Sequence, residues 1–450
     1  MTKLDLTRGS VGKALLRFSL PFLLSYFLQT LYGMADLYII GQFCGVESTT
    51  AVSIGSQVMH MVTVIIVGLA MGSVVVIGQT VGAGAKARLE KAVGNTVSLF
   101  LLLSLGGTLL LLALGRPLVS WISTPAAAIP GTIRYLQICF WGIPLITGYN
   151  VISSILRGMG DSKTPMYLIA GACLMNIALD YLFIGYFQLG PSGTALGTTL
   201  SQSFSVLLSL LFIRRRGELQ LSARDFWPER ETLGKILKIG LPVALQDGFI
   251  QISFMLVTVF VNQRGLEDAA AVGIVEKLIS LLFLLPSSML QTVSTLSAQN
   301  IGAGKPRRAR ASLSWGCGIC VLWGLGAVVL MTFSAEQIIG LFSKDPRTIQ
   351  LGTQYMQSYV WDCVFAGVHF CFSGYFCACG RAYLSFLHNA ISILLVRLPF
   401  SYMAATYFLD SLFPMGLAST VGSLLSVLLC LGLDAYFRRR DKESPGKIPE

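Results

Sequence analysis

The sequence contains few charged residues. Only 12% of its 450 residues are Asp, Glu, Lys or Arg, whereas a soluble globular domain usually has about 25%. The apolar set AVILMFWYC makes up 54% of the chain, and the mean hydropathy is +0.69. This composition excludes a cytosolic enzyme and a disordered or fibrous chain, and it indicates an integral membrane protein.

Several motifs of energy-coupled and catalytic membrane proteins are also missing. The sequence has no Walker A motif, so we expect no ATP-driven transport within this chain. It has no DDxxD cluster, no HExxH pattern and no nucleophile elbow, so we expect no enzyme. Most of the ten cysteines lie in apolar segments, where thiols pack as small hydrophobes. We therefore expect no cofactor, and no metal site beyond one for a coupling Na+.

Long runs without charge indicate helices that cross a membrane. Each run exceeds the roughly 20 apolar residues that span a bilayer as a helix. The runs are 48–85, 92–115, 278–304 and 311–335. The strict polar and apolar alternation of a transmembrane barrel is absent. The predicted fold is an all-α polytopic membrane protein.

Turn residues and charge clusters predict twelve transmembrane helices. The predicted spans are 16–42, 51–81, 93–115, 132–156, 165–187, 193–213, 236–262, 270–300, 311–333, 351–376, 384–409 and 415–437. The first apolar run lacks a small-residue cleavage site, so we interpret it as a span and not as a signal peptide.

The basic residues gather on one side of this topology. Of the 33 Lys and Arg residues, 26 lie in the N-terminal segment, alternate loops and the C-terminal tail, and the opposite loops contain five. The positive-inside rule then predicts that both termini face the cytoplasm. The net charge of +11 is thereby explained by orientation in the membrane and contact with anionic lipid. We expect no nucleic-acid partner.

An internal repeat with an offset of about 220 residues divides the chain. Residues 79–84 (QTVGAG) recur as residues 299–304 (QNIGAG), and residues 12–15 (GKAL) recur as residues 234–237 (GKIL). Each half holds six predicted spans in the same orientation. We therefore expect two six-helix lobes related by a pseudo-two-fold axis along the membrane normal, with substrate bound between them.

The repeat also sets the predicted domain boundaries. They define an N-lobe, a cytoplasmic linker, a C-lobe and a cytoplasmic tail, at residues 1–213, 214–235, 236–437 and 438–450.

Four motifs in order identify a family that the chain resembles. They are LP at residues 20–21 with MAD at 34–36, GQTVGAGAKARLEKA from Gly78, LRGMGDSKTP from Leu156 and MNIALDYLFI from Met175. Together they resemble the multidrug and toxic compound extrusion (MATE) family over about residues 10–437.

The resemblance implies a transporter of the bacterial cell membrane that exports cationic or amphipathic organic compounds. It implies antiport with Na+ or H+ through alternating access, and we expect a monomer. The alternative is a lipid-linked oligosaccharide flippase of the same superfamily. A flippase would be expected to have a more cationic cavity, and only Lys277 and Arg397 are basic within the spans.

The coupling site is predicted from carboxylates inside the spans of the first half. A charge at the bilayer centre costs roughly 2.5–3.5 kcal/mol even on lenient scales, so Asp36 and Asp180 need a partner or a cavity. Asn176 lies one helical turn from Asp180, and Thr194 lies one turn from Thr198. Such oxygen ligands suit an alkali cation, and two neighbouring carboxyls equally suit a proton.

In the MATE family the positions of Asp36, Asn176, Asp180 and Thr198 form the cation or proton site, and Thr194 matches through its backbone carbonyl. The alternative is that both carboxylates only hydrogen-bond neighbouring helices. The second half lacks counterparts of the two carboxylates, so we expect one coupling site per chain.

Two further sets of side chains are candidates for function. The candidates for the substrate cavity are Tyr32, Met34, Gln246, Met255 and Lys277. Packing or a lipid-facing position is the alternative for Tyr32 and Met34. Asp362 and Arg397 fall near the middle of their spans and form a candidate buried pair, either as a structural contact or as a gate.

Overall fold

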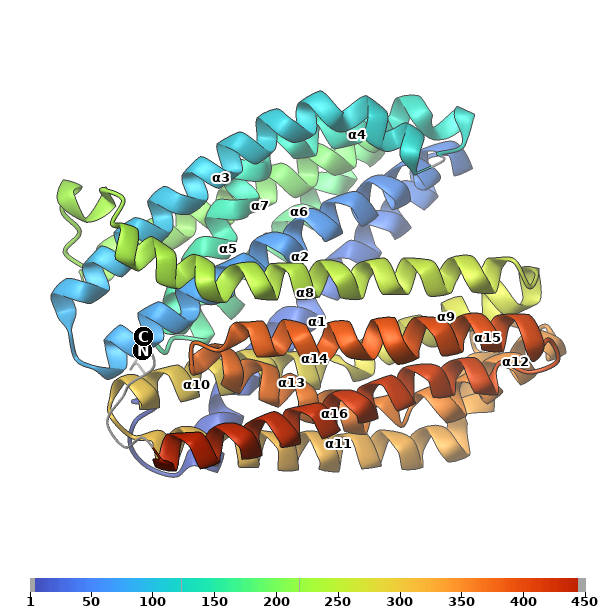
Figure 1. Ribbon diagram of the computed structural model, residues 1–450. Coiled ribbons are helices and arrows are strands. Elements are labelled where there is room, and N and C mark those ends of the chain that lie inside the picture. The colour runs from blue at the N-terminus through green and yellow to red at the C-terminus, as the bar shows by residue number, and fades with distance from the viewer. Residues whose placement is uncertain (1–4, 123, 218, 444–450) are drawn as a thin grey trace. The chain divides into compact units, whose positions relative to one another are not determined.

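The computed structural model describes residues 5–122, 124–217 and 219–443, and all regular elements in these ranges are helices (Figure 1). Ten helices are long and apolar enough to cross a membrane, and the number is twelve if each of two bent helix pairs is one span. Every predicted span coincides with one of these helices or pairs. The prediction of an all-α polytopic membrane protein is confirmed.

The first half of the chain forms seven α-helices and three short elements. They are α1 (Val11–Phe43), α2 (Val46–Gly82), α3 (Lys86–Trp121), η1 (Ala126–Ala128), α4 (Ile129–Trp141), α5 (Ile143–Gly158), α6 (Lys163–Asp180), the π-helical η2 (Tyr181–Tyr186), α7 (Pro191–Arg216) and η3 (Ala223–Phe226).

The second half forms nine α-helices and one π-helical element. They are α8 (Arg230–Asn262), α9 (Leu266–Leu282), α10 (Leu284–Gly302), α11 (Pro306–Gly340), α12 (Pro346–Tyr359), α13 (Asp362–Ala378), α14 (Ala382–Ser392), the π-helical η4 (Ile393–Arg397), α15 (Leu398–Tyr407) and α16 (Phe413–Glu443).

Two predicted spans are bent in the middle. The axes of α4 and α5 differ by 51°, and Pro144 lies in the first turn of α5, where it donates no backbone hydrogen bond and prevents a straight continuation from α4. The axes of α12 and α13 differ by 41°. No proline lies at that second break, and nothing else in the structure explains it.

The chain packs as two compact units. The first unit comprises Met1–Gly248 and Thr295–Ala309, and the second comprises Phe249–Ser294 and Arg310–Glu450. These units differ from the predicted lobes because the beginning of α8 and the end of α10 belong to the first unit. The lobes describe the sequence repeat, and their boundaries stay a prediction.

Each unit has its own hydrophobic core. In the first unit Ile39 and Ile40 of α1 pack in a cluster with Phe140. In the second unit the rings of Tyr355 and Tyr359 lie 5.3 Å apart within the main cluster. The outward face of α3 is different, since several leucines near its middle are more than half exposed, among them Leu102 at 64% and Leu109 at 67%. An apolar face of this length is typical of contact with lipid.

The side chain of Arg264 links two loop regions at one end of the second unit. It lies in the turn between α8 and α9, and its side chain is only 3% exposed. Its Nε lies 2.9 Å from Oδ1 of Asp268, and its terminal nitrogens donate to the carbonyl oxygens of Ala404, Leu409 and Ser411. One guanidinium therefore joins this turn to the connection between α15 and α16.

Arg264→Met is expected to destabilise the protein because it leaves three carbonyls and the Asp268 carboxylate, whose side chain is only 13% exposed, without their donor. Breaking such a pair costs about 3–5 kcal/mol, and we expect the melting temperature of the detergent-purified protein to fall by at least about 5 °C. The matched control is Arg347→Met, since the side chain of Arg347 is half-buried and donates to a neutral group, Oε1 of Gln350, at 3.4 Å. Equal melting temperatures for both variants would contradict this role of Arg264.

Candidate functional site

The predicted coupling residues lie on three helices of the first unit. Asp36 is on α1, Asn176 and Asp180 end α6, and Thr194 and Thr198 begin α7. Both α1 and α7 pack against α6. Three helices from separate parts of the first half therefore bring these side chains to one place.

These side chains face one another in a buried environment. The carboxyl of Asp36 interacts with the side chains of Asp180, Asn176 and Thr198. Asp36 is 4% exposed, Asn176 is 1% exposed, and Asp180 and Thr194 are fully buried. Sequence reasoning named all of these residues, and the structure brings them together.

The polar atoms of this cluster are poorly satisfied. In the described part of the chain, both carboxylate oxygens of Asp180, one oxygen of Asp36, both amide atoms of Asn176 and the hydroxyls of Thr194 and Thr198 are buried without a well-formed hydrogen bond. Buried polar atoms without partners are costly. The cluster therefore presents several oxygen ligands at the boundary of α1, α6 and α7.

Two features of this cluster were missed by sequence reasoning. Gly197 of α7 packs directly against Oδ1 of Asp180, so that any side chain at this position would displace the carboxylate. Immediately after Asp180 the helix continues as the π-helical η2, a conformation that occurs often at functional sites. The sequence offered only one hint that Gly197 belongs to the site, which is its position between Thr194 and Thr198.

The chemistry of the cluster suits a small cation or a proton. Carboxylate, amide and hydroxyl oxygens are hard ligands of the kind that alkali and alkaline-earth cations accept. Within the described ranges, no group of three or more His, Cys, Asp or Glu side chains has the arrangement of a metal site. The two carboxylates at close range also form a pair that shares one proton more easily than it carries two charges.

The candidates for the substrate cavity are divided between the two units. Tyr32, Met34 and Gln246 belong to the first unit, and Met255 and Lys277 belong to the second. Met34 and Met255 are exposed, Tyr32 is half-buried and Gln246 is buried. Tyr32 lies one turn before Asp36 on the same face of α1. The assembly of these residues into one cavity stays a prediction.

Asp362 and Arg397 both lie in the second unit. Asp362 begins α13, and Arg397 ends η4. Among the described residues, Oδ1 of Asp362 and Nε of Arg397 have no hydrogen-bond partner. The guanidinium of Arg397 instead lies 4.1 Å from the ring centroid of Phe254, a distance typical of a cation–π contact. The role of this pair stays a prediction.

The sequence of this chain is similar to a protein family model and to known transporters. The MatE family model matches the chain twice, at residues 21–182 and 242–403. The chain is 30% identical over 407 residues to the "Probable multidrug resistance protein YpnP" of Bacillus subtilis, covering 90% of this chain and 91% of the relative. It is 26% identical over 439 residues to the "FAD transporter" of Shewanella oneidensis, covering 94% of both chains.

A solved structure has a similar fold. The MOP superfamily transporter of Pyrococcus furiosus Vc1 superposes with a TM-score of 0.91 at 22% identity, and the match covers 99% of this chain and 100% of that one.

Proposed function

This chain belongs to the MatE family of membrane transporters, and we propose that it exports cationic or amphipathic organic compounds by antiport with Na+ or H+. The transporter class follows from the family, and relatives named multidrug resistance proteins support a role in multidrug transport. The observation that carries the antiport proposal is the buried oxygen cluster of Asp36, Asn176, Asp180 and Thr198.

The cluster supports coupling because its affinity for a cation or a proton depends on the residues that surround the two carboxylates. Two carboxylates buried together repel each other, so uptake of one cation or one proton relieves this repulsion. A conformational change that alters the contacts of α1 with α6 alters the affinity for that charge. Ion binding and conformation are then linked in both directions.

The proposed transport cycle is alternating access in a bacterial cell membrane. Both termini face the cytoplasm, as the distribution of Lys and Arg predicts. Na+ or H+ binds at the cluster of Asp36 and Asp180 from the outside, disfavours the substrate-bound state and so releases the substrate. The loaded carrier returns inward, releases the ion and binds a new organic cation. One chain with one coupling site is the functional unit.

A flux assay on reconstituted full-length protein tests this proposal. Vesicles are loaded with a fluorescent organic cation, and the Na+ and H+ gradients are clamped one at a time. We expect release of the dye to accelerate several-fold with one of the two gradients and not with the other. The same vesicles are tested with FAD, because one relative is named an FAD transporter.

Two results of this assay would contradict antiport of organic cations. One is dye release that is independent of both gradients. The other is gradient-independent scrambling of a polyprenyl-linked lipid, which would favour the flippase alternative.

A further inference from the structure

The two copies of the repeated glycine motif touch each other within the first unit. A methyl group at Gly82, the end of α2, would overlap the carbonyl oxygen of Gln299, and a methyl group at Gly302, the end of α10, would overlap the carbonyl oxygen of Gln79. The contact is reciprocal between the two halves of the sequence repeat. Only glycine lets two helix ends approach this closely.

A second contact joins the same two halves of the repeat a few turns away. Gly72 of α2 packs against the carbonyl oxygen of Ile236, and Gly240 of α8 packs against the carbonyl oxygen of Leu69. The last turns of α2 are therefore in backbone contact with both α8 and α10. Any movement that separates the end of α2 from α8 and α10 must therefore break these backbone contacts.

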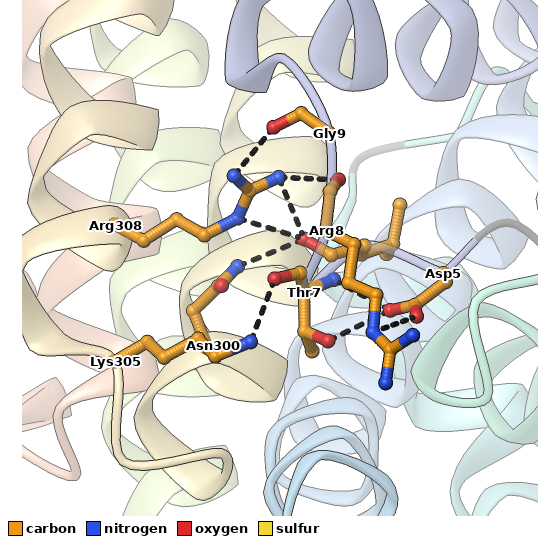
Figure 2. Close-up of polar contacts among 8 residues, drawn as sticks. Asp5, Thr7, Arg8, Gly9, Asn300, Lys305 and Arg308 are labelled. Atoms are coloured by element: carbon orange, nitrogen blue, oxygen red, sulfur yellow. Dashed lines mark hydrogen bonds and ion pairs between the residues drawn. The ribbon is translucent and has the colours of Figure 1, made fainter.

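Residues 6–9, here called the first strap, are bound through their backbone (Figure 2). Arg308 donates to the carbonyl oxygens of Leu6, Arg8 and Gly9, at 2.6 Å for Gly9 and 2.7 Å for Arg8. Asn300 also donates to Leu6, at 3.2 Å, and Lys305 donates to Thr7 at 3.0 Å. Four successive carbonyls are held by three side chains around the turn from α10 to α11.

The first strap is shaped by local contacts and anchored by an apolar side chain. The hydroxyl and backbone N–H of Thr7 donate to Oδ1 of Asp5 at 2.7 and 3.0 Å, and the hydroxyl bond is the main cause of the lowered pKa of Asp5. Gly9 adopts a φ of +73°, which other residues rarely adopt. Leu6 is fully buried. The strap is thus a defined structure that docks on the α10–α11 turn.

Residues 225–229, here called the second strap, are bound by α3. Nδ2 of Asn95 donates to the carbonyl oxygens of Asp225 and Trp227 at 3.2 Å each, and Oδ1 of Asn95 accepts from the backbone N–H of Glu229 at 2.7 Å. Gly94 permits this approach, because a methyl group there would overlap the carbonyl oxygen of Asp225. A single amide side chain therefore holds three backbone groups.

Each strap leads into one half of the repeat and is bound by the other half. The first strap precedes α1, the first helix of the first half, and it binds Asn300, Lys305 and Arg308 of the second half. The second strap precedes α8, the first helix of the second half, and it binds α3 of the first half. Each half therefore holds the leading segment of the other, at the end of the unit where the glycine motifs meet.

We propose that the two straps form a double latch that keeps the glycine contact closed, and that both straps detach when this end of the transporter opens. The proposal rests on the alternating access proposed above. Its physical basis is that the straps are tied mainly through backbone groups, the first by the charged side chains of Arg308 and Lys305 and the second by the neutral amide of Asn95. The charge-assisted hydrogen bonds of the first strap are stronger than neutral ones, and the bonds of both straps exchange for water once the halves move apart.

The latch is tested by the accessibility of a thiol in the closed contact. Ala298 is fully buried and faces Gly78, so Ala298→Cys places a thiol there. The purified full-length protein is treated with a membrane-impermeant maleimide, and alkylation at residue 298 is quantified by peptide mass spectrometry. We expect Arg308→Gln and, independently, Asn95→Ala to accelerate this alkylation about tenfold, since each removes several hydrogen bonds.

Two controls separate opening of the latch from loss of structure. Arg307→Gln removes the same charge from the exposed neighbouring residue, and we expect the rate of the Ala298→Cys parent. The native Cys139 lies in the core of the first unit and is 1% exposed, and its alkylation is expected to stay slow in every variant. Equal rates at residue 298 in all proteins, or an acceleration that Arg307→Gln or Cys139 shares, would overturn the proposal.

The alkylation assay needs no substrate and no ion gradient. If the latch variants behave as expected while the vesicles show no driven efflux, the proposed antiport is wrong and the latch stands. If efflux is driven and residue 298 is equally protected in all variants, the latch is wrong and the antiport stands.

Discussion

Asp36→Asn is expected to reduce gradient-driven efflux to the level of vesicles without protein. The amide has nearly the shape of the carboxyl but takes up no proton and carries no charge, so the neighbouring Asp180 carboxylate no longer has a partner for sharing a cation. Removal of a buried charge also removes its desolvation cost. The melting temperature of the variant is therefore expected to equal or exceed that of the wild type.

The matched control is Asp410→Asn, which makes the same exchange at an exposed position in the second unit. We expect it to leave efflux and melting temperature unchanged. Undiminished efflux in Asp36→Asn would exclude Asp36 as the coupling residue, even if the flux assay confirms antiport.

Gly197→Ala is expected to weaken coupling without changing any polar group of the site. The added methyl would overlap Oδ1 of Asp180, and the carboxylate would have to move from its present position. We expect the concentration of the coupling ion that gives half-maximal efflux to rise about tenfold, which corresponds to about 1.4 kcal/mol of lost binding. The measurement is an efflux titration with the driving ion.

Gly171→Ala tests whether any glycine in this part of the bundle has the same effect. Gly171 lies on α6 near the site, and a methyl group added there meets no atom within 4 Å. Because Ala favours helix more than Gly does, this variant is expected to be as active and at least as stable as the wild type. A normal titration in Gly197→Ala would show that the close contact with Asp180 is not needed for ion binding.

The membrane topology could be predicted because it depends on composition over long windows. Runs such as residues 48–85 leave no alternative to a buried or lipid-facing helix, and α2 does extend over Val46–Gly82. The bends depend on local details. Pro144 gave a signal for the bend between α4 and α5, but no comparable signal marks the bend between α12 and α13.

The candidate site could be predicted only in part. Asp36 and Asp180 were conspicuous because carboxylates are rare inside spans, and the repeat supplied a half without them. Gly197 has no side chain and therefore no chemical signal of its own. Its importance depends on the distance between two helices, which the sequence does not contain.

The straps were missed for a related reason. Arg308, Lys305 and Asn300 bind residues 6–9 through their carbonyl groups, which every residue possesses, so the sequence does not reveal these contacts. Arg308 was visible only as part of a basic loop that was assigned to orientation, and Asn300 only as part of the repeated motif at residues 299–304. A basic residue can serve topology and a specific contact together, and only the structure separates the two roles.

The π-helical η2 restricts how the proposed ion site can be transplanted into designed proteins. A π turn holds one residue more than an α turn, and removal of one residue rotates the preceding helix by about 100° relative to the segment after the turn. Asn176 and Asp180 lie just before this turn, so an idealised straight helix grafted onto α7 would point both side chains elsewhere. A designer must therefore copy Tyr181–Tyr186 together with the proposed ion ligands.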